Sequence, residues 1–137
     1  MNWAQRTMWD TEEQIDDLEV EPRKWMSFLD GFSRQHEDWL ASIEVSTPSG
    51  KLTEVVDRRL RGVSIDHADG RRRLYVAVGD AADECLTHVV DTPTQIRFKR
   101  NRTGAHRGLD IVSADGSTTH VRFRSAMLPE MLDGIAS

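Results

Sequence analysis

The amino-acid sequence predicts an α+β fold, in which an N-terminal amphipathic helix packs on a small, partly closed antiparallel β-barrel or curved sheet of roughly six to eight short strands. Two observations lead to this prediction. Between Pro22 and Leu40, apolar residues recur at steps of three and four, which is the period of one helix face. After Leu40, short segments alternate apolar and polar residues between turn sequences, as half-buried strands do.

The length of 137 residues suits one domain and is short for two. We therefore expect residues 1–17 to form an acidic, tryptophan-containing arm and residues 18–137 to form a single α+β domain. The single cysteine, Cys85, cannot form an internal disulfide, which fits a reducing compartment. No apolar run reaches the length of a membrane span and the N-terminus lacks the pattern of a secretory signal, so the expected location is the cytoplasm.

The excess of negative charge in the chain is local to its N-terminal third. Seven carboxylates and no cation lie between Asp10 and Glu21, whereas residues 41–137 hold 13 acidic and 14 basic side chains. Trp3 and Trp9 lie in the same arm. Two interpretations stay open: the arm lies on a basic sheet face of its own or a neighbouring subunit with the tryptophans as anchors, or it is a solvated tail.

The helix is expected to begin near Pro22, since a proline in the first turn loses no backbone hydrogen bond. Gly31 lowers the helix propensity of the middle turn by roughly 1 kcal/mol relative to alanine, and would allow a strand or another helix to approach closely. The apolar stripe of the helix consists of Trp25, Phe28, Leu29, Phe32, His36, Trp39 and Leu40. His36 is interpreted as a hydrogen-bonded histidine at the boundary of this stripe.

Period-two alternation and turn residues place the strands. Two of the separating turns contain Asp-Gly, which favours tight hairpins, and Gly62 suggests a bulge within one long curved strand. A brief extended stretch is expected at Leu18–Val20, and a last helical turn at Met127–Leu132. The expected strands are Ser42–Thr47, Leu52–Arg59, Arg61–Asp66, Arg72–Val78, Glu84–Val90, Thr94–Arg100, Arg107–Ser113 and Ser117–Arg124.

A set of short motifs resembles a known family. They are Trp25, Phe28 and Phe32-Ser-Arg-Gln-His-Glu37 with Trp39-Leu40, then Val78-Gly-Asp80 and Leu86-Thr-His88, then Ser113-Ala-Asp-Gly-Ser-Thr-Thr119 and Arg122-Phe-Arg-Ser-Ala-Met-Leu128. Together they resemble an uncharacterised bacterial family, domain of unknown function 5335, over about residues 20–134. The resemblance implies a stand-alone bacterial cytoplasmic protein and carries no activity, cofactor or site residue with it.

No catalytic, cofactor-binding or metal-binding residues are predicted. The five histidines show no metal-site spacing, and Gly-x-Ser-x-Gly and glycine-rich phosphate loops do not occur. Strand alternation would point Cys85 and His88 to opposite faces, so Cys85 is interpreted as a small buried apolar residue. The strand carboxylates Glu44, Asp57, Asp66 and Asp110 are expected to be solvated at the surface.

The strand faces suggest an interaction surface. Arg97 and Lys99 alternate with apolar residues, and so do Arg122 and Arg124. If the two strands share a sheet, these four cations form a basic patch that would complement the acidic arm. The candidate interaction residues are Trp3, Trp9, Arg97, Lys99, Arg122 and Arg124.

Three classes of function follow from these features. The preferred one is a non-enzymatic binding or protein-interaction module that pairs with itself as a homodimer or with another protein, and not with a membrane. The second is a small-molecule-binding barrel or enzyme with a polar mouth formed by His88, His120 and Tyr75. The third is a weak binder of single-stranded nucleic acid through the basic strand face, which the pI of about 5.5 disfavours.

Overall fold

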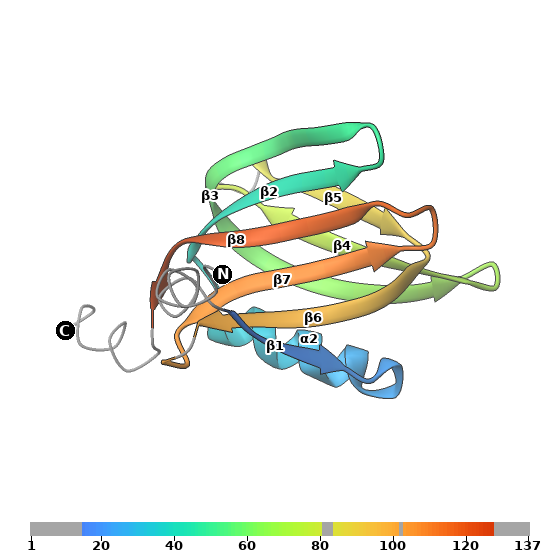
Figure 1. Ribbon diagram of the computed structural model, residues 1–137, viewed down its shortest axis with the longest axis horizontal. Helices are drawn as coiled ribbons and strands as arrows, with labels where there is room; N and C mark the ends of the chain where they lie inside the picture. The colour runs from blue at the N-terminus through green and yellow to red at the C-terminus, as the bar shows by residue number, and fades with distance from the viewer. Residues whose placement is uncertain (1–14, 81–83, 102, 128–137) are drawn as a thin grey trace, which may run out of the picture.

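The computed structural model describes residues 15–80, 84–101 and 103–127, in which eight strands form one antiparallel sheet and two short helical segments precede β2 (Figure 1). The order of the strands across the sheet is β1-β6-β7-β8-β2-β3-β4-β5. The strands are β1 (Ile15–Val20), β2 (Leu40–Thr47), β3 (Gly50–Ala68), β4 (Arg71–Val78), β5 (Leu86–Asp91), β6 (Pro93–Asn101), β7 (His106–Ser113) and β8 (Thr118–Met127). The helical segments are the 3-10 turn η1 (Pro22–Lys24) and the α-helix α2 (Trp25–Gln35).

The predicted α+β class and curved antiparallel sheet are confirmed, but the sheet does not close into a barrel, because β1 and β5 lie at its two ends. The expected strands 52–59 and 61–66 are one continuous strand, β3. Its register shifts between Leu60 and Gly62, as the glycine suggested. The arm residues Trp3 and Trp9 lie outside the described residues, and so does most of the expected helical turn at 127–132.

The long strand β3 makes the sheet fold back on itself. Its first part, from Gly50 to Arg59, pairs with β2, and its second part, from Leu60 to Ala68, pairs with β4. The second part of β3 therefore runs with β4 and β5 in a layer behind β2, β8, β7 and β6 (Figure 1). The core lies between the layers and includes Leu74 and Val76 from β4 and Ile111 from β7.

The helix α2 brings an aromatic face to the same core. Phe32 is buried, and its ring centroid lies 5.9 Å from that of Phe123 on β8 and 5.8 Å from that of Phe98 on β6. On β3, Val63 is bound twice by Ser33, whose hydroxyl donates to the Val63 carbonyl at 2.9 Å and accepts from the Val63 N–H at 2.7 Å. The apolar stripe that the sequence predicted thus contributes core residues.

Two glycines have opposite surroundings. A Cβ atom on Gly31 would meet nothing within 4 Å, so the expected close approach of another element at Gly31 is wrong. Gly108 on β7 has a φ of +144°, and a Cβ there would lie 1.7 Å from the carbonyl oxygen of Val121 on β8. The close approach of two backbones therefore occurs at Gly108, where β7 pairs with β8.

We expect Gly108→Ala to lower the free energy of unfolding by about 3 kcal/mol, because the methyl group collides with backbone and the φ value is strained for alanine. Gly31→Ala is the matched control and should raise the stability by up to about 1 kcal/mol, since alanine is the better helix former. Urea unfolding followed by circular dichroism measures both changes. Equal stabilities of the two variants would contradict the assigned roles.

Candidate functional site

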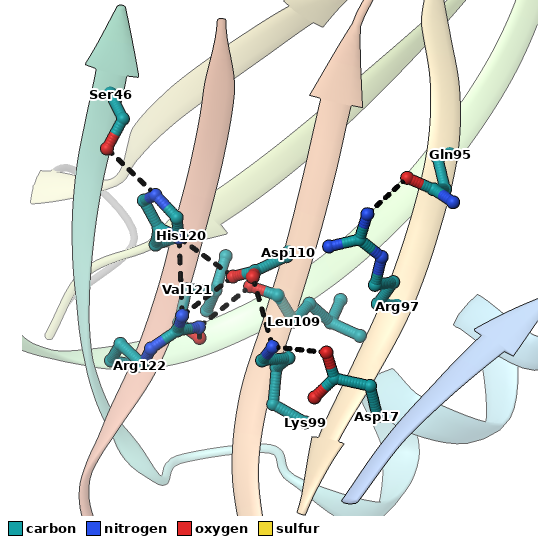
Figure 2. A network of polar contacts seen from close by, with 10 residues as sticks. All are labelled: Asp17, Ser46, Gln95, Arg97, Lys99, Leu109, Asp110, His120, Val121 and Arg122. Atoms are coloured by element: carbon teal, nitrogen blue, oxygen red, sulfur yellow. Dashed lines mark hydrogen bonds and ion pairs between the residues drawn. The ribbon is translucent and has the colours of Figure 1, made fainter. Parts of the chain in front are cut away.

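A group of polar side chains lies on the outer face of the sheet, across the neighbouring strands β1, β6, β7, β8 and β2 (Figure 2). Leu109 and Ile111 on β7 point into the core, so Asp110 between them points outward. Its partners are the outward residues of the adjacent strands, Lys99 on β6 and His120 and Arg122 on β8. Lys99 and Arg122, two of the expected cations, therefore share this face, and an acidic residue lies between them.

Asp110 is only 5% exposed, so the expectation of a solvated surface carboxylate is wrong for this residue. Its Oδ1 atom lies 2.8 Å from His120 Nδ1 and 2.8 Å from an Arg122 nitrogen, and its Oδ2 atom lies 3.4 Å from Lys99 Nζ. Burial alone would raise the pKa of Asp110, but Arg122 and His120 outweigh it and hold the pKa below its ordinary value. Asp110 is therefore a buried carboxylate that stays ionised.

The end of the acidic segment joins this network from the sheet edge. In the β1–β6 register, Asp17 lies opposite Lys99 and Glu19 lies opposite Arg97. The Lys99 ammonium donates to Asp17 Oδ2 at 2.7 Å, so the buried lysine bridges Asp17 and Asp110. Charge pairing between acidic and basic residues opposite each other thus accompanies the addition of β1 to the sheet.

His120 connects Asp110 to a serine on β2. Its Nδ1 atom lies 2.8 Å from Asp110 Oδ1 and its Nε2 atom lies 2.9 Å from Ser46 Oγ. Since an ionised carboxylate only accepts hydrogen bonds, Nδ1 must carry the proton at this distance. When the imidazole is neutral, Nε2 is then the acceptor, and the Ser46 hydroxyl donates to it. Arg122 also approaches Nδ1, at 3.2 Å, but a donor cannot bond to a protonated nitrogen, so this is only a close contact.

The arrangement Ser46–His120–Asp110 has the connectivity of a nucleophile, a general base and a group that orients the base. A serine hydroxyl hydrogen-bonded to a neutral imidazole can lose its proton as it attacks an electrophile. Ser46 could not be identified from the sequence, because β2 and β8 are far apart in the chain. The Asp110–His120 pair was accessible: the turn at Asp115-Gly116 lies midway between them, and hairpin strands pair symmetrically about their turn.

The residues of the predicted interaction surface are only partly brought together. Lys99 and Arg122 lie in the Asp110 network, and Arg97 donates to Gln95 at 2.7 Å on the same face. Arg124 is exposed on β8. Trp3 and Trp9 lie outside the described residues.

The three residues of the predicted polar mouth do not converge. His88 forms a hydrogen bond with the buried Thr119 on β8. His120 follows Thr119 on the same strand, so the side chain of His120 points to the opposite face of the sheet. Tyr75 is directly between the buried Leu74 and Val76 on β4 and so points outward. Cys85 is exposed, which makes the expectation of a buried apolar residue wrong; it precedes β5 and lies outside the strand alternation.

The region between β3 and β5 contains a cavity of about 490 Å³. Val55 and Val78 are buried there, whereas Val56 and Leu86 are exposed. The other lining residues are Glu54, Arg58, Glu84 and Cys85. Because β4 pairs only with the second part of β3, the side of residues 50–59 that faces away from β2 has no paired strand among the described residues. The same is true of the outer edge of β5.

His36 is the most deeply buried histidine of the described part and lies in an aromatic cluster with Phe32, Trp39 and Phe123. It is 0% exposed, deeper than the boundary position expected. Its Nδ1 donates to the Phe32 carbonyl at 2.7 Å, so its Nε2 accepts from Nδ1 of His106 at 2.7 Å. Burial lowers the pKa of His36 to about 4, which keeps it neutral.

No helix among the described residues combines the length and apolar character that crossing a membrane requires. No group of three or more histidine, cysteine, aspartate or glutamate side chains in this part of the chain is arranged to hold a metal ion.

The chain belongs to the Family of unknown function (DUF5335), whose family model matches residues 16–131. The match confirms the resemblance seen in the sequence motifs. No curated protein and no solved structure matches the chain.

Asp110→Ala is expected to lower the free energy of unfolding by roughly 3–5 kcal/mol, because it leaves Arg122 half-buried without its counter-ion and leaves the buried Lys99 with Asp17 alone. Asp91→Ala removes an exposed carboxylate paired with Arg73 and should cost less than about 1 kcal/mol. Denaturant unfolding at pH 7 measures both. A loss below 1 kcal/mol for Asp110→Ala would show that the network does not stabilise the sheet.

The protein should lose stability as the pH falls from about 6.5 to about 4. His36 has a lower pKa when folded than the ordinary value of 6.5, so the unfolded chain takes up a proton first and is favoured by acid. The loss amounts to about 1.4 kcal/mol per pH unit, or about 3 kcal/mol in all. Thermal or urea unfolding across this range measures it.

The control is His36→Phe, which keeps a ring in the aromatic cluster and removes the titrating group. Its stability should vary much less between pH 6.5 and pH 4.5. The carboxylates with lowered pKa, Asp110 and Asp115, affect stability only near and below their ordinary value of 3.8. The same slope in His36→Phe would assign the pH dependence to other groups.

Proposed function

We propose that the protein is a bacterial cytoplasmic protein-interaction module that pairs with a second copy of itself along the outer edge of β5. The observation that carries the proposal is the character of that edge. β5 has no paired strand on its outer side within the described residues, and it exposes Leu86 and Val89. A strand edge of this kind is a template for pairing with another chain.

The exposed apolar residues of the described part gather near this edge. Six large apolar side chains are exposed, and four of them lie on β3 and β5: Leu52, Val56, Leu86 and Val89. Val56 and Leu86 also line the cavity between the two strands. Clusters of exposed apolar residues next to unpaired backbone are features of protein interfaces.

Charge favours a second copy as the partner at β5 and opposes it at the other edge. β1 carries Asp17 and Glu19, so two β1 strands side by side would bring carboxylates together. From Leu86 to Val90, β5 contains no aspartate, glutamate, lysine or arginine. Two β5 strands can therefore pair antiparallel about a two-fold axis without repulsion, each copy using the same surface.

The other classes of function have less support. Nucleic-acid binding needs free cations, but Lys99 and Arg122 are held by Asp110 and Lys99 also by Asp17. The polar mouth lacks the convergence of His88, His120 and Tyr75 described above. The acidic arm as the dimer contact is also less favoured, because Asp17 binds Lys99 of its own subunit.

Light scattering coupled to size exclusion should show a dimer for the full chain and a monomer for Val89→Lys. In that variant each copy would bring a lysine to the paired β5 strands, and the two positive charges would repel each other. Leu18→Lys is the matched control: Leu18 on β1 is 47% exposed and Val89 on β5 is 48% exposed. Leu18→Lys should remain a dimer. Deletion of residues 1–14 should also leave the dimer intact.

Three results would contradict the proposal: a monomeric full chain at micromolar concentration, a dimeric Val89→Lys, or a monomer caused by the deletion alone. The last result would transfer the contact to the arm. Circular dichroism of each variant establishes that it is folded.

A further inference from the structure

We propose that Ser46 is an activated nucleophile that is acylated by carboxylic esters with good leaving groups, with His120 as its general base and Asp110 as the residue that orients the base. This activity goes beyond the interaction role and does not depend on it. It also revises the expectation of a chain without catalytic residues. The inference rests on two hydrogen bonds, on the tautomer that they fix and on the surroundings of Ser46.

The tautomer is the one that a base requires. Asp110, ionised and buried, accepts the Nδ1–H of His120 over an N···O distance of 2.8 Å, and in the neutral imidazole this leaves Nε2 unprotonated toward Ser46 Oγ at 2.9 Å. The three side chains come from three adjacent strands, β2, β8 and β7, whose pairing is continuous around them (Figure 2). Groups placed on paired strands hold their geometry better than groups on loops.

The cations around Asp110 hold it in place. Arg122 contacts the same oxygen, Oδ1, as His120, and the Lys99 ammonium lies 3.4 Å from Oδ2, so both cations help to hold the carboxylate where it contacts Nδ1. The same cations share the negative charge of Asp110, which then stabilises an imidazolium less than a carboxylate bonded only to neutral donors would. We therefore expect a nucleophile that reacts with activated esters and not with amides.

Ser46 is half-buried on the outer face, and its neighbours supply a cation. Lys51 on β3 and Thr118 on β8 lie directly opposite Ser46 in the two flanking registers, so both share its face. Side chains opposite each other in a sheet are about 5 Å apart at Cβ, which lets the Lys51 ammonium reach an oxyanion formed at Ser46. The cavity between β3 and β5 is lined by other residues, and the proposal is limited to esters with a small acyl group.

The reaction balances without a cofactor. The Ser46 oxygen attacks the ester carbonyl carbon while its proton passes to His120 Nε2, and the carbonyl π electrons move to the oxygen. As the tetrahedral intermediate collapses, the bond to the leaving group breaks, and the leaving oxygen takes the proton from Nε2. Water then attacks the acyl-serine with His120 again as base, which releases the carboxylic acid and restores the hydroxyl.

The test uses the full chain with p-nitrophenyl acetate and with a fluorophosphonate, which reacts with activated serines. We expect release of p-nitrophenol and a covalent phosphonyl adduct that peptide mapping by mass spectrometry assigns to Ser46. Ser46→Ala should abolish the adduct. His120→Gln, which leaves Ser46 without a base, should slow labelling by roughly 100-fold.

The matched control is Ser49→Ala, a serine in the turn of the same hairpin, which should label at the rate of the unchanged chain. Lys51→Met tests the oxyanion role and should slow ester cleavage at least tenfold without changing the fold. Circular dichroism confirms folding of every variant. Labelling no faster than that of the urea-unfolded chain, an adduct that persists in Ser46→Ala, or an unchanged rate in His120→Gln would each overturn the proposal.

Since Ser46 lies on β2 and the proposed dimer contact lies on β5, the two proposals fail separately. Val89→Lys should retain Ser46 labelling while it dissociates the dimer. Loss of labelling in that variant with its fold intact would overturn the independence of the nucleophile from the dimer.

Discussion

The fold depends on the path of β3, which belongs to both layers of the molecule. A strand of 19 residues is too long to pair with one neighbour, so its first part completes the sheet beside β2 and its second part starts the layer of β4 and β5. The register shift next to Gly62 and the contact of Val63 with Ser33 lie just after this change of partner. The same path leaves the first part of β3 unpaired on one side, which creates the cavity and the exposed apolar residues beside β5.

The outer face shows how a sheet accommodates charge. Strand alternation places outward side chains of β6, β7 and β8 next to one another. The cations among them offset the desolvation free energy of the Asp110 carboxylate, so the fold can bury it. The acidic segment ends in β1, where it supplies a second carboxylate to Lys99. Complementary charge therefore favours the position of β1 at this edge, although hydrogen bonding between the strands supplies most of the contact.

Much of the fold could be predicted from the sequence, because it depends on local patterns. The helix, the strands and the Asp-Gly hairpins follow from periodicity and turn chemistry, and the outward direction of Lys99 and Arg122 follows from alternation. What failed depends on contacts between distant segments. The burial of Asp110 needs three strands in register, the depth of His36 needs the sheet behind the helix, and the place of the close backbone approach is Gly108 instead of Gly31.

The Ser46–His120–Asp110 arrangement supplies a nucleophile and a base, which is only part of what an efficient hydrolase needs. A cleft excludes water, strengthens electrostatic stabilisation and positions the substrate, and these effects supply most of the rate of an efficient hydrolase. The proposed nucleophile and base lie on the outer face of the sheet, with Lys51 and Thr118 opposite Ser46 on the two flanking strands. Strand pairing therefore accounts for the positions of the nucleophile, the base and the residues beside them, whereas a high rate would need substrate-binding contacts in addition.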